Sequence, residues 1–345
     1  MVRKRITMEV VAKKANVSQS TVSHVINKTA PISPAVEKKV NEVIKELNYI
    51  PNAAARNLKR NKTNIIGLVI PDVSNGYYTE IIENTETILR ENGYITFLCN
   101  TLYNTEFEKV YIENLVQQNV AGIIIGYGLI NRNLYQYLLD FGVPFVVMDD
   151  TEIVENSKIL CVKINNTNGS LLAVEHLYNI KSKKICFASE ALFNSTSKAR
   201  YDGFYAAAKQ YGYTDHCIVE YISNVQGNRL EIGYNIGAQI YLDGTIDGIF
   251  ANTDNIAIGI TQRLREYNVS IPNDIAIIGY DGISLSALVT PTLTTVVQPH
   301  KEMARRGLQM LIKRINGGEL ENATIELEPT LIIRESTMKK KLFQG

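Results

Sequence analysis

Short polar side chains recur along one face of residues 17–27, VSQSTVSHVIN. If a helix begins after Ser18, this face presents a polar set made of Gln19, Ser20, Ser23, His24 and Asn27. Side chains of this kind near the start of a helix can hydrogen-bond to base edges and phosphates in the major groove of DNA. A polar face is also the normal property of a solvated helix, so the surrounding chain has to decide between the two interpretations.

Other types of chemistry find little support in the sequence. Metal-ligand spacing is absent among the four histidines, which are His24, His176, His216 and His300. No nucleophile elbow or phosphate-binding loop occurs, and GYGLIN at residues 126–131 lacks the third glycine of the dinucleotide fingerprint. We therefore expect no enzymatic activity, no metal and no cofactor.

The charge of the 345-residue chain is distributed unevenly, although its net value is only +1. Residues 1–64 carry 13 basic and 4 acidic side chains, a net charge of +9. The remainder carries 23 basic and 31 acidic side chains, a net charge of −8. A basic head on an acidic body indicates a polyanion as the partner of the head, which favours the DNA-reading interpretation.

Three short helices should position the polar face. They are expected at residues 8–15, 19–26 and 34–47, preceded by the N-cap residues Thr7, Ser18 and Ser33. Only residues 15–17 separate the first two helices, and Asn16 can adopt the left-handed conformation that a sharp turn needs. Val22 and Ile26 are expected to pack inward, opposite the polar face.

The next segment, residues 49–63, changes character and is expected to be a hinge. Pro51 interrupts the helical pattern. The three alanines at 53–55 favour a helix, but this helix would be too short to be stable alone. From residue 64 onward, apolar runs alternate with helical stretches. The strands are expected at residues 65–70, 94–99, 121–126, 144–148, 184–188, 248–251, 275–280 and 293–297. Ile- and Val-rich strands between helices predict an α/β fold with two doubly wound parallel sheets, whose ligands lie beyond the carboxyl ends of the strands.

The compartment is expected to be the cytoplasm. No stretch approaches the roughly 18 apolar residues of a membrane span, and the charged start of the chain runs into a helical pattern without a signal-peptide core. The cysteines have neither disulfide nor zinc spacing and are expected to be reduced: Cys99, Cys161, Cys186 and Cys217.

Several motifs in order resemble the lactose-repressor (LacI/GalR) family. The head and hinge carry ITMEVVAKKANVSQSTVSHVINKTAPIS and then NYIPNAAARNLK. The similarity continues through PDVSNGYY at 71–78, FANTDNIAIG at 250–259 and PTLTTVVQP at 291–299. The resemblance implies a helix-turn-helix head joined to two lobes of the periplasmic-binding-protein type. The expected domains are 1–48, the hinge 49–63, a first lobe of 64–160 with 291–322, and a second lobe of 161–290 with 323–338.

For DNA, the resemblance implies three groups of contacts. Gln19, Ser20 and His24 would face the bases, and Ser18, Thr21 and Asn27 would position the DNA backbone. Leu58 would insert into a minor-groove step, or else be an ordinary hydrophobic anchor. The remaining DNA-binding candidates are Thr7, Ser23, Tyr49, Asn52, Ala55 and Lys59. The family commonly has arginine at the position of His24, so we expect a different base to be read there.

For the effector, the resemblance implies a cleft lined by Asp72, Tyr77, Tyr78, Asn194, Arg200, Asp254 and Asp281. Carboxylates, a guanidinium and an aromatic face suit a polyol such as a sugar or sugar phosphate. Structural roles stay open: an ion pair of Arg200 with Asp281, an N-cap at Asp254, and core packing of the tyrosines. The sequence also departs from the family's sugar-responsive members at Thr253, Gly282 and Asn228.

The predicted protein is a sequence-specific transcriptional regulator, a repressor that binds a pseudo-palindromic operator as a homodimer or tetramer. A small molecule is expected to change operator affinity, with a protein or purine corepressor as the alternative. A sugar-transport binding protein would have a similar body, but the basic head and the missing export signal oppose that alternative.

Overall fold

The computed structural model describes residues 6–49, 63–153, 158–192, 194–224, 227–320 and 322–338. The chain divides into two units, Met1–Thr63 and Asn64–Gly345, so the second unit begins where the body was expected to begin. Each unit has its own hydrophobic core.

Within residues 6–49, the head contains three helices, α1 (Met8–Ala15), α2 (Gln19–Asn27) and α3 (Pro34–Glu46). Asn16 ends α1 in the left-handed conformation, with φ 50° and ψ 49°, and lets α2 start three residues later. Ser18 caps α2 with its side chain, and Pro34 occupies the first turn of α3. Val22 and Val25 are buried, whereas Ile26 is only partly buried, because α2 turns Val25 rather than Ile26 toward its neighbours.

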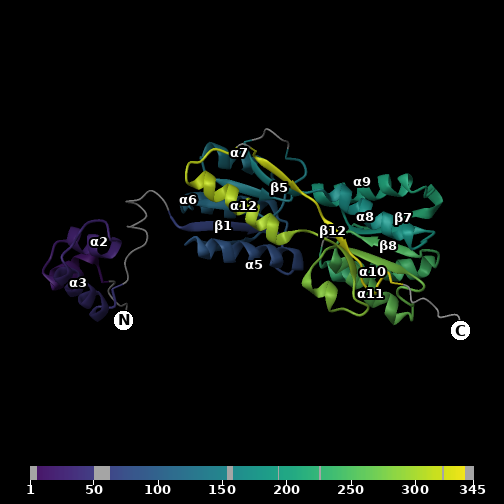
Figure 1. The fold of residues 1–345 in the computed structure, drawn as a ribbon, viewed down its shortest axis with the longest axis horizontal. Helices are drawn as coiled ribbons and strands as arrows, with labels where there is room; N and C mark the ends of the chain where they lie inside the picture. Colours follow the sequence, from purple (N-terminus) through teal and green to yellow (C-terminus); the bar gives the residue numbers. More distant parts are fainter. Residues whose placement is uncertain are drawn as a thin grey trace. The chain divides into compact units, whose positions relative to one another are not determined.

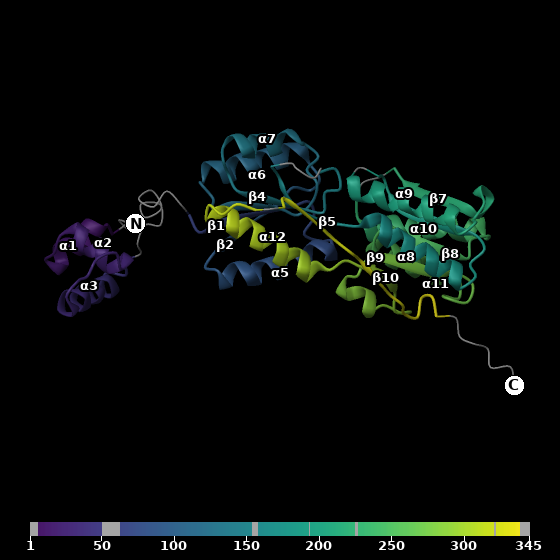
Figure 2. The same ribbon diagram turned by 45° about the horizontal axis from the view of Figure 1, so that its top comes forward.

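The described residues of the body form two six-stranded sheets. The first has the order β11-β5-β4-β3-β1-β2, in which every pair is parallel. Its strands are β1 (Ile65–Ile70), β2 (Ile95–Asn100), β3 (Gly122–Ile125), β4 (Phe145–Met148), β5 (Leu160–Ile164) and β11 (Thr324–Leu327). Helices α5 (Gly76–Glu91) and α12 (His300–Ile315) cover one face, and α6 (Thr105–Gln117) and α7 (Asn133–Asp140) cover the other (Figures 1 and 2).

The second sheet has the order β12-β10-β9-β8-β6-β7, with only β12 antiparallel. Its strands are β6 (Ile185–Glu190), β7 (Ile218–Ser223), β8 (Gly248–Ala251), β9 (Ala276–Asp281), β10 (Thr294–Val297) and β12 (Thr330–Ile332). Helices α8 (Asn166–Asn179) and α9 (Ser195–Gln210) pack together on one face, and α10 (Arg229–Asp243) and α11 (Asp254–Glu266) on the other (Figure 1). Two 3-10 turns, η1 (Asp215–Cys217) and η2 (Ser284–Ala287), complete this lobe.

The chain changes from one sheet to the other later than the sequence led us to expect. It leaves the first sheet after Ile164, returns to the first lobe after Val297, and leaves it again after Leu327. The expected changes after residues 160, 290 and 322 therefore need correction. The reason is that β5, β10 and β11 each complete their hydrogen-bonded pairing before the chain crosses.

Candidate functional site

The start of α2 presents exposed hydroxyl and amide groups. Ser18, Gln19 and Ser20 are all exposed. The Ser18 hydroxyl accepts a hydrogen bond from the Thr21 amide at 3.1 Å and lies 2.6 Å from the Ser20 hydroxyl. The helix N-terminus therefore carries a connected set of hydroxyls that can meet phosphates or bases.

Farther along α2, two polar side chains have partners within the head. The Asn27 amide donates to the Ser23 carbonyl at 2.8 Å, so Asn27 is folded back on its own helix. The His24 Nδ1 lies 2.9 Å from the Thr29 hydroxyl, just beyond the helix end. His24, Thr21, Ser23 and Asn27 remain partly exposed on this side of the head.

The other DNA-binding candidates fall in different environments. Thr7 is the exposed N-cap residue of α1, without a side-chain cap hydrogen bond. Tyr49 is only 7% exposed and belongs to the core of the head. Four candidates of the hinge, Asn52, Ala55, Leu58 and Lys59, lie outside the described residues, so the minor-groove role of Leu58 stays a prediction.

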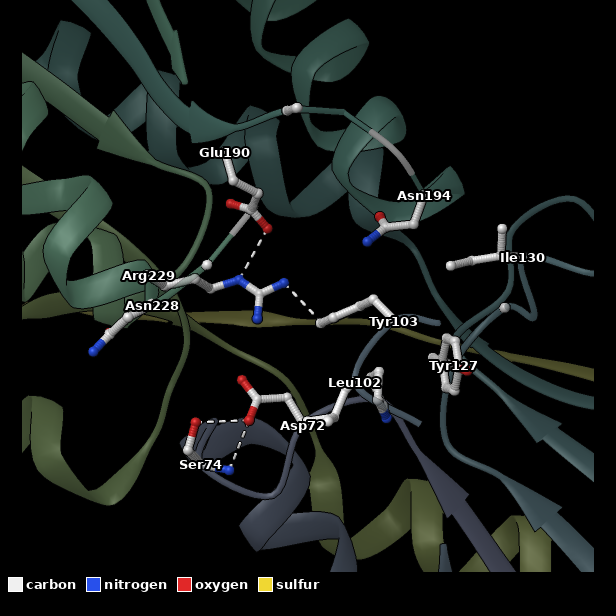
Figure 3. A pocket seen from close by; sticks show the side chains of 14 residues that line it. Asp72, Ser74, Leu102, Tyr103, Tyr127, Ile130, Glu190, Asn194, Asn228 and Arg229 are labelled. Atoms are coloured by element: carbon white, nitrogen blue, oxygen red, sulfur yellow. Dashed lines mark hydrogen bonds and ion pairs between the residues drawn. The ribbon is translucent and has the colours of Figure 1, made fainter. Parts of the chain in front are cut away.

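In the body, a cavity of about 480 Å³ lies between the two lobes (Figure 3). Its lining comes from both sheets: Pro71, Asp72, Ser74, Leu102, Tyr103, Tyr127, Gly128, Ile130, Glu190, Ala191, Asn194, Gly227, Asn228 and Arg229. Most of these residues directly follow the carboxyl end of a strand, namely β1, β2, β3 or β6. This is where open parallel sheets bind ligands.

The cavity lining contains an ion pair that also has a partner across the cleft. The Arg229 Nε donates to a Glu190 carboxylate oxygen at 2.9 Å, and Nη2 donates to the hydroxyl of Tyr103 at 2.8 Å (Figure 3). Arg229 and Glu190 belong to the second lobe, whereas Tyr103 follows β2 of the first. Burial alone would raise the pKa of Glu190, but Arg229 and hydrogen bonds hold it below its usual value.

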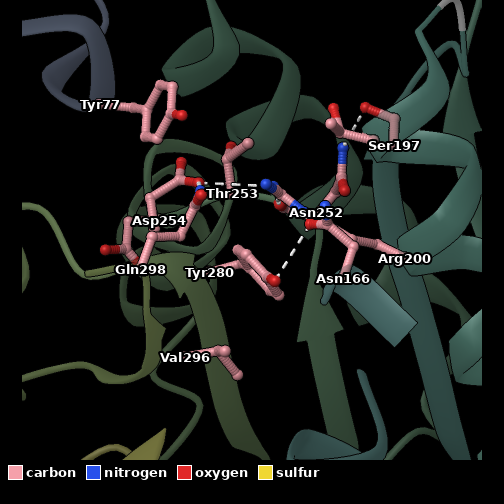
Figure 4. A network of polar contacts seen from close by, with 12 residues as sticks. Tyr77, Asn166, Ser197, Arg200, Asn252, Thr253, Asp254, Tyr280, Val296 and Gln298 are labelled. Atoms are coloured by element: carbon pink, nitrogen blue, oxygen red, sulfur yellow. Dashed lines mark hydrogen bonds and ion pairs between the residues drawn. The ribbon is translucent and has the colours of Figure 1, made fainter. Parts of the chain in front are cut away.

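A buried polar network is centred on Arg200 (Figure 4). The Arg200 Nε donates to Asn166 Oδ1 at 2.8 Å, and Nη1 donates to the Asn252 carbonyl at 2.8 Å. The ring of Tyr280 lies under the guanidinium, with Cζ 3.7 Å from the ring centroid. The Asn252 amide also donates to Glu190 at 3.3 Å, which links this network to the cavity.

Three carboxylates share this region. Asp281 and Asp149 lie 3.4 and 3.9 Å from the Arg200 guanidinium. Asp254 does not contact Arg200; it accepts hydrogen bonds from the Gly282 and Ile283 amides and from the Thr295 hydroxyl. Burial raises the pKa of Asp281 to about 6 even though Arg200 lowers it, and burial followed by Asp281 raises the pKa of Asp254 well above its usual range.

Two of the seven effector candidates line the cavity, Asp72 and Asn194. Tyr77 and Tyr78 are 5% and 7% exposed and pack in the core of the first lobe. Arg200, Asp254 and Asp281 are buried in the polar network, and Thr253 rather than Asp254 is the N-cap of α11.

Sequence reasoning missed the residues that dominate the cavity wall: Leu102, Tyr103, Tyr127, Ile130, Glu190 and Arg229. A usable signal was present, because Tyr103 and Glu190 stand at the ends of strands that the apolar runs had indicated. The departures from family pattern also have structural roles. Asn228 caps α10, and Gly282 has a φ of 75° with Val297 only 2.7 Å from an added Cβ, so a residue with a side chain would not fit there.

Membrane-spanning helices and metal-binding clusters are both absent from the described residues. No helix in this part of the chain is long and apolar enough to cross a membrane. No group of three or more His, Cys, Asp or Glu side chains among the same residues could hold a metal ion.

Comparisons with known proteins agree with this architecture. Residues 7–52 match the family described as bacterial regulatory proteins, lacI family, and residues 174–337 match a periplasmic binding protein-like domain. The HTH-type transcriptional repressor PurR of Pasteurella multocida is 35% identical over 338 residues, 97% of this chain and 99% of that protein.

Solved structures show the same fold. The Lac repressor dimer bound to operator and the anti-inducer ONPF has a TM-score of 0.83 at 23% identity, covering 97% of this chain and 99% of that one. A periplasmic binding protein/LacI transcriptional regulator from Alkaliphilus metalliredigens, complexed with D-xylulofuranose, has a TM-score of 0.71 at 30% identity, covering 80% and 100%. This chain belongs to the lacI family of bacterial regulatory proteins, and it is a DNA-binding transcriptional regulator controlled by a small molecule rather than an enzyme.

Proposed function

We propose that this protein is a cytoplasmic repressor whose dimer binds a pseudo-palindromic operator, and that a neutral, hydroxyl-bearing small molecule in the interlobe cavity sets its operator affinity. The cavity is the observation that carries this proposal. It lies at the carboxyl ends of both sheets and is lined by groups from both lobes, so a bound molecule would contact both lobes at once.

The charges of the cavity favour a neutral ligand. Its charged lining residues are Asp72, Glu190 and Arg229, and Arg229 is already paired with Glu190. Among the described residues, the Asp72 carboxylate has no cationic partner, and it accepts hydrogen bonds only from the amide and hydroxyl of Ser74. A phosphate or carboxylate beside Asp72 would be repelled, whereas ligand hydroxyls could donate to its free oxygen.

The neutral amides of the cavity complement this carboxylate. Asn194 and Asn228 each use Oδ1 to cap a helix, which leaves their NH₂ groups as donors to a ligand. Leu102, Tyr127 and Ile130 supply an apolar side. A sugar fits this combination, and the D-xylulofuranose complex of a 30% identical regulator supports that class. A purine base or nucleoside is the second candidate, because tyrosine faces can stack on a base.

The dimer is supported by an apolar edge of the first lobe. Strand β2 is the edge strand of its sheet, yet Ile95, Phe97 and Leu98 are 54%, 45% and 47% exposed. Exposed apolar edges of this kind are normally covered. The Lac repressor is described as a dimer on its operator, and we assign this edge of the present chain to contact with a second copy.

Ligand binding tests the proposal directly. Isothermal titration of the full chain with neutral sugars, nucleosides and purine bases, and with their phosphorylated forms, should show binding by one neutral class only. Arg229→Gln should weaken that binding at least tenfold, because it leaves Glu190 unpaired beside the ligand. Arg306→Gln, which removes an exposed arginine of α12, is the matched control. Tighter binding of the phosphorylated forms would contradict the neutral cavity.

A further inference from the structure

The contact between His24 and Thr29 is the starting point. His24 lies in α2, partly exposed, and Thr29 lies beyond the end of that helix. Lys28 between them adopts the left-handed conformation, with φ 50° and ψ 41°, and turns the chain back so that the Thr29 hydroxyl reaches Nδ1 at 2.9 Å. Among the residues that the structure describes, the other ring nitrogen, Nε2, has no hydrogen-bond partner.

A hydrogen bond to one nitrogen of a neutral imidazole decides what the other nitrogen can do. If the threonine hydroxyl donates to Nδ1, the proton of the ring is on Nε2, which then donates. If Nδ1 donates to the hydroxyl, Nε2 accepts instead. An imine nitrogen is the better acceptor and a hydroxyl the better donor of this pair, so the first arrangement is favoured. Nε2 is then a donor, which suits the N7 and O6 acceptors of guanine.

We propose that Thr29 is a specificity-determining positioning residue, because its hydroxyl orients His24 and presents the Nε2 hydrogen to an acceptor in the major groove. This inference rests on the proposed function. Thr29 itself need not touch DNA. Its hydroxyl restrains the rotation of an otherwise mobile side chain, and it selects which hydrogen-bonding face His24 offers to a base.

Three variants separate this role from others. Thr29→Val keeps the shape of the side chain and removes the hydroxyl, whereas Thr29→Ser keeps the hydroxyl. His24→Ala identifies the base pair of the operator that His24 reads. The full-length proteins are compared by selection of operators from randomised DNA at physiological salt, and thermal unfolding shows that each variant is folded.

The proposal predicts that Thr29→Val loses about tenfold of the discrimination at the single base pair identified by His24→Ala, and keeps the other positions. Thr29→Ser should select the same operator as the wild type. An equal loss of affinity for every sequence in Thr29→Val would assign Thr29 to a phosphate contact and overturn the proposal. Unchanged specificity in Thr29→Val would also overturn it. Failure of the wild type to select any sequence would instead overturn the proposed function.

Discussion

At the scale of single residues, Asp281 of the buried polar network has an unusual backbone and electrostatic environment. It is 3% exposed, has a φ of 116°, and lies 3.4 Å from Arg200 and 2.8 Å from the Gln298 amide. A non-glycine residue in this region of φ is strained. Among the described residues, the Oδ1 of Asn252 and the Oε1 of Gln298 are buried nearby with no hydrogen-bond partner.

The raised pKa of Asp281 predicts a pH-dependent stability. Burial raises it to about 6, so between pH 4 and 6 the folded state holds a proton that the unfolded state releases. The stabilisation from this proton is present at low pH and is lost as the pH rises through 6. From pH 5 to 7.5, the loss should be about 1 kcal/mol, or about 2 to 4 °C in Tm.

Thermal unfolding at pH 5 and 7.5 measures this effect. Asp281→Asn should reduce the difference in Tm between the two pH values by that amount, because the amide does not titrate. Asp202→Asn, at an exposed position of α9, should leave the difference as in the wild type. An identical pH dependence in Asp281→Asn and the wild type would show that Asp281 has an ordinary pKa.

The sequence predicted only those cavity residues that a family resemblance could identify, and it missed those that meet through the fold. Asp72 and Asn194 were predicted from the family resemblance, and they line the cavity. Arg229 and Tyr103 meet across the cleft from positions 126 residues apart, and no local pattern reports such a meeting. The residue type alone also could not distinguish Arg200, which is buried in the polar network, from Arg229, which lines the cavity.

At the scale of elements, a glycine allows close packing of the helix that begins with the cavity residue Arg229. Helix α10 begins at Arg229 and packs on α11, which begins at Asp254. An added Cβ at Gly259 would lie 2.1 Å from the Leu230 carbonyl oxygen and 2.7 Å from the Tyr234 amide nitrogen. The two backbones approach so closely that only glycine fits between them.

Gly259→Ala should therefore destabilise the body by about 1 to 3 kcal/mol, measured by urea unfolding. The sign of this change in the free energy of unfolding is informative, because alanine in a helix is otherwise more stable than glycine by about 1 kcal/mol. Gly227→Ala is the control, since its Cβ would meet nothing within 4 Å and its stability should stay close to that of the wild type. Stabilisation by Gly259→Ala would mean that α10 and α11 pack less closely than described.

The elements also show where prediction from sequence ended. The buried strands other than β5 were indicated by Ile- and Val-rich runs, and the three helices of the head by their caps. Strands β5, β7, β11 and β12 were not identified as strands. The last three lie at sheet edges, are partly exposed, and contain polar residues or are very short, whereas β5 is a buried strand of only five residues that includes Lys163. The edge strand β2 was predicted as a strand because its exposed residues are apolar and continue the apolar run.

At the scale of the whole molecule, the apolar edge of β2 predicts the assembly state. Phe97→Lys should convert the dimer to a monomer in sedimentation equilibrium, because a charge would have to be buried in the interface. Its operator affinity should fall accordingly, since a monomer presents a single head. Phe141→Lys, at a 61% exposed phenylalanine that follows α7, should remain a dimer. A dimeric Phe97→Lys would place the interface elsewhere.

The central claim is that the cavity and the operator are energetically coupled. The most direct test is a titration of labelled operator with the full chain at fixed physiological salt, without and with a saturating concentration of the neutral ligand. We predict that the ligand changes the operator Kd by about 5- to 150-fold, and that the operator changes the ligand Kd by the same factor. An operator Kd that stays the same when the cavity is occupied would contradict the account.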